Sequence, residues 1–247
     1  MKIYYTYDGS FDGLLTAIYE AYYRREKPEK ILLEEDYQEN LFLKRVHIHT
    51  DREKAKRVYD SIKSKISNES LKNIFYTYLS ELEDLGTWVY QYLKLGWKIG
   101  KHIDLNLADD RVLVIHKIRL KIDREKHLML GLIRFRRLQG NIYYAPIEPK
   151  FNIVGLVAPH FVDRLGEENW VIHDVKRGIG AVYNGEEWII RDIDLEAELE
   201  YGNDEFIYQK LWQEYFKSIA IKNRINPKLQ KRNMPMRYWR YLVEKNG

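Results

Sequence analysis

Between residue 51 and about residue 129 the apolar side chains recur at helical spacing, whereas the segments on both sides carry strand patterns. The clearest helical stripe consists of Leu71, Ile74, Phe75, Tyr78, Leu79, Leu82 and Leu85. A second stripe of this kind runs from Val112 to Ile122. A helical stretch with strands before and after it predicts an α+β fold, with mixed or antiparallel sheet elements, a largely helical middle and a helical C-terminal tail.

β-branched and aromatic residues predict strands near the N-terminus and in the second half of the chain. The predicted strands are 2–7, 31–33, 46–50, 132–137, 142–145, 170–174, 181–183 and 188–190. The turn Gln139-Gly140-Asn141 predicts a hairpin between two of them. Helices are expected over 14–22, over 152–165 and along the stripe from Tyr208 to Ile219.

The chain shows no internal repeat and no low-complexity linker. We therefore expect a single compact body over residues 1–247. A subdivision into a strand- and helix-rich part, 1–130, and a hairpin-containing part with a basic helical tail, 131–247, stays open.

The sequence contains no cysteine, which excludes disulfides, zinc–thiolate sites, cysteine-bound iron–sulfur clusters and a catalytic thiol. It has no apolar run near the ~18 residues that cross a bilayer, and its start lacks the layout of a signal peptide. We therefore expect a cytoplasmic protein with no membrane partner. No cofactor-binding motif is evident, and the residues leave metal binding and oligomeric state undetermined.

The net charge of +4 hides a strong segregation of charge along the chain. Residues 186–205 contain nine acids and one base, whereas 216–243 contain eight bases and no acid. Residues 117–137 contain eight bases and two acids. Two oppositely charged segments so close in sequence either neutralise each other within the fold or each face a partner.

In the basic tail, positive side chains alternate with stackable rings, which is the combination that binds a phosphate backbone with exposed bases. The alternative is a solvated basic face with Trp239 packed in the core. The candidate nucleic-acid-binding residues of the tail are Lys217, Arg224, Lys228, Lys231, Arg232, Arg237, Trp239 and Arg240.

The predicted hairpin offers a second set of such residues. Alternation places Arg134 and Arg136 on one strand face, near Tyr143 of the return strand. Arginines beside tyrosines on a sheet face could form a nucleic-acid platform, as in sheet-based RNA-binding proteins. A half-buried hairpin with a hydrated arginine face is the alternative.

Two clusters could carry chemistry. His160, His173 and Asp174 are the best candidates for catalysis, although 13 residues separate the two histidines. The second cluster is a loop between a strand and a helix, for which either phosphate binding or a structural turn with a helix cap is open. This loop consists of Asp8, Gly9, Ser10, Phe11, Asp12 and Gly13.

Several segments together resemble a bacterial family of uncharacterised proteins assigned to DNA metabolism or DNA repair. These segments are Tyr7–Leu15, Arg134–Pro149, Pro159–Phe161 with Trp170–Asp174, and Asn226–Trp239. The resemblance covers essentially the whole chain. One departure is Val243, where we expect a proline.

The resemblance implies an association with a radical-SAM protein that carries a helix-hairpin-helix DNA-binding element. It also implies that related domains are sometimes fused to a uracil-DNA-glycosylase-like domain. Because this chain lacks cysteine, a radical-SAM cluster would belong to the partner. The resemblance carries over no catalytic residues.

Our leading hypothesis is a DNA-binding accessory protein in DNA repair or DNA modification. The alternatives are an enzyme that acts on DNA or a nucleotide through the His/Asp cluster, and a protein–protein adaptor. Whether the chain is an enzyme stays open.

Overall fold

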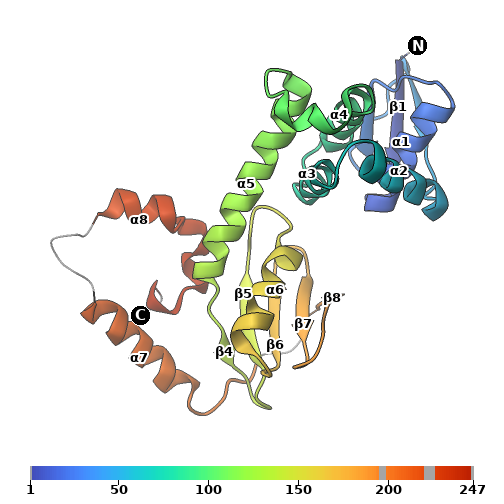
Figure 1. Ribbon diagram of the computed structural model, residues 1–247. Helices are drawn as coiled ribbons and strands as arrows, with labels where there is room; N and C mark the ends of the chain where they lie inside the picture. The colour runs from blue at the N-terminus through green and yellow to red at the C-terminus, as the bar shows by residue number, and fades with distance from the viewer. Residues whose placement is uncertain (1, 195–198, 220–225, 246–247) are drawn as a thin grey trace. The chain divides into compact units, whose positions relative to one another are not determined.

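The computed structural model describes residues 2–194, 199–219 and 226–245 (Figure 1). It divides into two units, residues 1–122 and 123–247, and the division falls within one long helix. Helices and strands are both abundant, so the predicted α+β class is confirmed. No helix in the described part of the chain is long and apolar enough to cross a membrane.

The first unit is built on a three-stranded parallel sheet with the order β2-β1-β3. Its elements are β1 (Lys2–Tyr7), α1 (Phe11–Tyr23), β2 (Lys30–Leu33), β3 (Leu43–His47), α2 (Arg52–Lys65), α3 (Asn68–Leu79), α4 (Leu85–Ile99) and η1 (Gly100–Leu105). Side-chain oxygens cap the N-termini of three helices. Ser10, Asp51 and Ser67 accept hydrogen bonds from backbone N–H groups in the first turns of α1, α2 and α3, respectively.

The longest predicted stripe, from Leu71 to Leu85, is divided between α3 and α4. The chain leaves the helix after Leu79, and Glu81 adopts a positive φ of 51° that an α-helix does not allow. The new helix direction lets α4 pack on β2, where the hydroxyl of Thr87 accepts a hydrogen bond from the backbone N–H of Ile31 (3.0 Å).

The carboxylate of Asp104 in η1 ties the helices of this unit together. It accepts hydrogen bonds from Ser70 (2.8 Å) and Asn73 (2.8 Å) of α3 and from Tyr92 (2.6 Å) of α4. His116 of α5 (Asp110–Leu132) lies 2.9 Å from the same carboxylate. Burial alone would raise the pKa of Asp104, but these hydrogen bonds outweigh it and hold the pKa below the usual value of 3.8.

The second unit contains a five-stranded sheet with the order β4-β5-β6-β7-β8, in which only the β5–β6 pair is parallel. Its elements after α5 are β4 (Arg136–Arg137), β5 (Tyr143–Ile147), α6 (Val154–Leu165), β6 (Trp170–Asp174), β7 (Ile179–Tyr183), β8 (Trp188–Asp192), α7 (Glu205–Ser218), α8 (Pro227–Asn233), η3 (Met236–Tyr241) and η4 (Val243–Lys245).

Helix α6 connects the two parallel strands and covers one face of this sheet, as Figure 1 shows. The residues of that face are paired across the strands: Ala145 with Ile172, Ile172 with Ala181, and Ala181 with Ile190. Trp170 is fully buried on the same face, within ring contact of Phe135. The predicted hairpin is present, but its first strand is reduced to Arg136 and Arg137, since Leu132 belongs to α5 and residues 133–135 are outside any strand.

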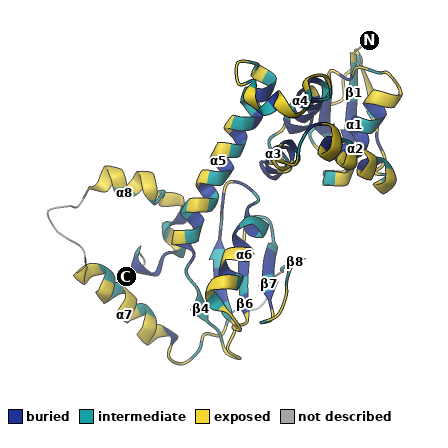
Figure 2. Ribbon diagram, viewed as in Figure 1, coloured by how far each residue is buried: buried dark blue, intermediate teal, exposed yellow. Residues whose placement is uncertain are grey.

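The tail does not form one buried helix. Helix α7 leaves Tyr208, Leu211, Tyr215 and Ile219 of the predicted stripe exposed. Asn226 caps α8, which starts at Pro227 and has no buried residue (Figure 2). The helices therefore follow the sequence pattern, whereas the apolar stripe of α7 faces outwards.

We predict that Asp104→Asn lowers the free energy of unfolding by about 3 kcal/mol at pH 7, because it removes the charge to which four side chains point. The contribution of a carboxylate with a lowered pKa is complete above its unfolded value and is lost as pH falls through the folded value. The difference between variant and wild type should therefore shrink below about pH 4. Urea unfolding of the variant and the wild type, at pH 7 and below about pH 4, measures this difference in the free energy of unfolding.

The matched control is Asp60→Asn, since the Asp60 carboxylate forms an exposed ion pair with Lys56. Its effect should stay below about 1 kcal/mol. Equal midpoints for the two variants at pH 7 would contradict the structural role of Asp104.

Candidate functional site

Two buried carboxylates fix the C-terminal segment within the second unit. Glu125 of α5 is 4% exposed and accepts hydrogen bonds from the backbone N–H groups of Lys150 and Phe151 (both 2.9 Å). The same carboxylate accepts hydrogen bonds from Arg237 (2.9 Å) and from the hydroxyl of Tyr238. Burial, followed by the hydrogen bond to Glu125, raises the pKa of Tyr238, so this phenol keeps its proton.

The second anchor is Glu244 of η4, whose side chain is fully buried. Arg134 donates two hydrogen bonds to it, from Nε (3.2 Å) and Nη2 (2.7 Å), and the indole N–H of Trp212 donates a third (3.0 Å). The guanidinium of Arg134 also lies over the Trp212 ring, 5.3 Å from its centroid. Burial would raise the pKa of Glu244, but the bonds from Arg134 and Trp212 prevail and lower it.

Arg134 and Trp212 of this contact line a pocket of about 610 Å³, which we call the arginine pocket. Its polar and aromatic lining residues are Arg134, Arg137, Arg164, Phe135, Tyr143, Phe161, Tyr208, Trp212, Gln209 and Glu205. The carboxylate of Glu205 accepts hydrogen bonds from the backbone N–H of Arg137 (2.8 Å) and from Gln209 (2.8 Å). A positive pocket with ring walls suits a planar ligand that carries a negative charge.

Four further basic residues of the predicted tail are exposed to solvent: Lys217 of α7 and Lys228, Lys231 and Arg232 of α8 (Figure 2). None of them forms an ion pair with a residue in the described ranges. Arg240 is different, since it forms an ion pair with Glu148. Arg224 lies outside the described residues.

The acidic segment 186–205 does not neutralise this tail within the part of the chain that the structure describes. The carboxylates that bind tail arginines are Glu125, which pairs with Arg237, and Glu148, which pairs with Arg240, and neither of them belongs to that segment. Glu196 and Glu198 lie outside the described residues. The open bases of α8 therefore keep their charge available.

The other residues predicted to bind nucleic acid lie at different places. Tyr143 and Arg134 line the arginine pocket, whereas Arg136 is paired with Tyr144 on the sheet face opposite α6. Its guanidinium lies 3.4 Å from the hydroxyl of Tyr201. The indole of Trp239 donates to the carbonyl of Met234 (2.8 Å), and the ring lies beneath the Lys245 ammonium.

The structure does not bring His160, His173 and Asp174 into one constellation. His160 is exposed on α6, which covers the face of the sheet that Asp174 shares. His173 points to the opposite face, where its Nδ1 lies 2.8 Å from the hydroxyl of Tyr144. Asp174 is fully buried and forms an ion pair with Arg177 (2.7 Å).

Burial lowers the pKa of His173, so its imidazole is neutral at pH 7. Burial also raises the pKa of its partner Tyr144, to about 12. The catalytic role of the three residues stays a prediction. No group of three or more His, Asp or Glu side chains in the described residues is arranged to hold a metal ion.

The loop after β1 forms a turn and a helix cap. Asp8 accepts hydrogen bonds from the backbone and hydroxyl of Ser10 (3.0 and 2.7 Å) and from the hydroxyl of Thr50 (2.7 Å). Ser10 accepts in turn from the backbone N–H of Gly13 (2.9 Å). A Cβ at position 13 would lie 2.2 Å from Asp8, and Gly9 has a φ of +83°. Asp12 is exposed in the first turn of α1, and phosphate binding here remains a prediction.

Three groups of the arginine pocket are not among the residues predicted from the sequence: Arg137, Arg164 and the α7 side chains Tyr208 and Trp212. One signal could have found Arg137. The turn at 139–141 pairs it with Tyr143, which places both on the same face. Nothing in the sequence shows that α7 lies beside α6 and the hairpin.

Residues 83–244 match the domain of unknown function DUF4130. The chain belongs to this family. No curated protein matches the sequence. The arginine pocket, Glu125, Glu244 and α8 all lie within the matched part of the chain, whereas the loop 8–13 lies outside it.

We predict that Glu244→Gln destabilises the protein by about 3 kcal/mol, because it leaves the partly buried charge of Arg134 without its counter-charge. The control is Glu186→Gln at an exposed position, with an expected change below about 0.5 kcal/mol. Urea unfolding measures both. Identical stabilities would show that the Arg134–Glu244 pair does not hold the tail.

Proposed function

We propose that this member of the DUF4130 family is a DNA-binding accessory protein in DNA repair or DNA modification, which acts in the cytoplasm. The observation that carries the proposal is a cluster of exposed basic side chains on α8, a helix without acidic residues. None of the described carboxylates pairs with the members of this cluster, Lys228, Lys231 and Arg232. Three bases on a short exposed helix suit sequence-independent contact with phosphates. The repair context and a radical-SAM partner rest on the sequence resemblance alone.

The arginine pocket supports a contact with an unpaired nucleotide. Tyr143, Tyr208 and Trp212 supply rings on which a base can stack, and Arg137 and Arg164 supply positive charge. A base within a duplex cannot enter such a pocket without leaving its stack. We therefore propose a preference for single-stranded DNA.

The alternative functions have less support. An enzyme that uses His160, His173 and Asp174 would need them within hydrogen-bond reach of one substrate, and they face different directions. The exposed apolar residues Ile207 and Leu211 of α7 favour the adaptor hypothesis as the second candidate.

We predict that replacing Lys228, Lys231 and Arg232 together by Gln weakens DNA binding and flattens its salt dependence. For three lost contacts to a single strand, the slope of log K against log salt should fall in magnitude by roughly two. Fluorescence anisotropy with a labelled oligonucleotide across a salt series measures the slope.

The matched control removes three exposed bases of the first unit, Lys63, Lys98 and Lys101, also by Gln. It changes the net charge equally and should leave the slope unchanged. No binding of wild type at low salt, or equal slopes for both triple variants, would refute the proposal.

We predict that Tyr208→Ala weakens single-stranded DNA binding about tenfold, through the loss of one stacking ring. Tyr208 is 60% exposed, so its truncation should not affect folding. The control Phe206→Ala removes a more exposed ring of the same helix that does not line the pocket. Equal losses for the two variants would argue against the pocket as the nucleotide site.

A further inference from the structure

The first unit contains a second aromatic groove, of about 600 Å³, between α1, α2 and α4. Ile18 and Val58 provide apolar lining, and four rings, Tyr19, Tyr22, Tyr23 and Trp97, stand around them. Only Trp97 of these six residues lies within the part of the chain that matches DUF4130. The arginine pocket and α8 contribute nothing to this groove.

Two of the rings are already stacked and leave a free face. The centroids of Tyr19 and Tyr23 lie 4.1 Å apart and their planes differ by 16°. Tyr23 is 68% exposed, so a further planar ring can extend the stack on its outer side. Tyr22 meets Trp97 edge to face at 4.8 Å, and Trp97 is fixed by a hydrogen bond from its indole N–H to Ser61 (3.1 Å).

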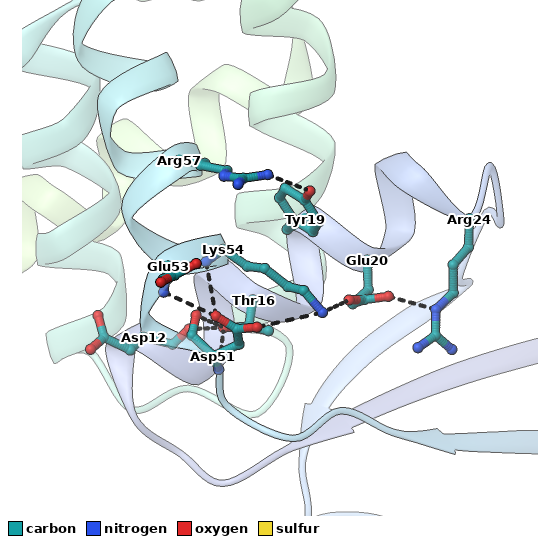
Figure 3. Close-up of polar contacts among 9 residues, drawn as sticks. All are labelled: Asp12, Thr16, Tyr19, Glu20, Arg24, Asp51, Glu53, Lys54 and Arg57. Atoms are coloured by element: carbon teal, nitrogen blue, oxygen red, sulfur yellow. Dashed lines mark hydrogen bonds and ion pairs between the residues drawn. The ribbon is translucent and has the colours of Figure 1, made fainter.

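Positive charge adjoins the stacked rings. Figure 3 shows Arg57 reaching from α2 to α1, where it donates a hydrogen bond to the hydroxyl of Tyr19 (3.3 Å). This hydrogen bond raises the pKa of Arg57, which stays charged. Lys65 also lines the groove, but it lies in the last turn of α2, where its charge partly offsets the helix dipole.

No acid is among the described lining residues of the groove, although Glu53, one turn before Arg57 on α2, attracts the guanidinium and contributes to its raised pKa. The neighbouring carboxylate of α1, Glu20, is already bound by Lys54 (2.8 Å) and Arg24 (2.6 Å), as Figure 3 also shows. A guanidinium has several fixed N–H donors and can bind a phosphate while one of them contacts Tyr19. The groove therefore combines a stacking surface with an anion-binding group.

We propose that this groove binds a nucleotide, with the base stacked on Tyr23 and the phosphate bound by Arg57. The same chemistry is offered by a free nucleotide and by an unpaired nucleotide of a DNA strand. This site is independent of the function proposed for the second unit.

The experiment titrates the full chain with deoxyadenosine monophosphate, with deoxyadenosine, and with a short deoxyadenylate strand, by calorimetry and Trp fluorescence. Tyr23→Ala should weaken binding of the monophosphate about tenfold. Arg57→Gln should weaken binding of the monophosphate. It should leave binding of deoxyadenosine, which is weaker in the wild type, unchanged. An effect of both variants on the strand alone would identify a strand nucleotide as the ligand.

The control Phe42→Ala removes another highly exposed ring, 82% exposed, outside the groove. The triple Gln variant of Lys228, Lys231 and Arg232 should bind the monophosphate as wild type does, which separates this test from the one for α8. The proposal is overturned if neither Tyr23→Ala nor Arg57→Gln changes binding of any probe, or if Phe42→Ala changes it equally.

Discussion

A carboxylate buried in an apolar interior needs a positive or hydrogen-bonding partner, and this requirement organises the second unit. Glu125 and Glu244 are both buried, and each takes an arginine: Arg237 for the first and Arg134 for the second. These pairs fix the C-terminal segment in place, and one of their residues, Arg134, lines the arginine pocket. They also determine which basic side chains remain available to bind phosphates, because an arginine that is bound to a carboxylate does not bind a phosphate at the same time.

Much of the fold could be predicted from the sequence, because periodicity reports local structure. The strands β1, β6 and β7, helix α1 and the α5 stripe follow their patterns closely. A pattern does not show where a helix must break, so the stripe 71–85 concealed the change of direction at Glu81. It also does not show what covers an apolar face, and the stripe of α7 proved to be exposed.

The candidate site was less accessible to prediction, because it depends on contacts between residues far apart in the chain. Strand alternation placed Arg134 and Arg136 together, yet Arg134 precedes the short strand β4 and binds Glu244, 110 residues away. The count of bases in the tail was informative, but only the structure separates the arginines bound to carboxylates from the bases of α8.

The most direct test of this separation is an NMR titration of the full chain with single-stranded DNA, observing the Nε–H signals of arginine side chains. We expect the signal of Arg232, on exposed α8, to shift with added DNA, and that of Arg237, which is bound to buried Glu125 and does not line the arginine pocket, to stay in place. A shift of the Arg237 signal with an unchanged Arg232 signal would contradict the account.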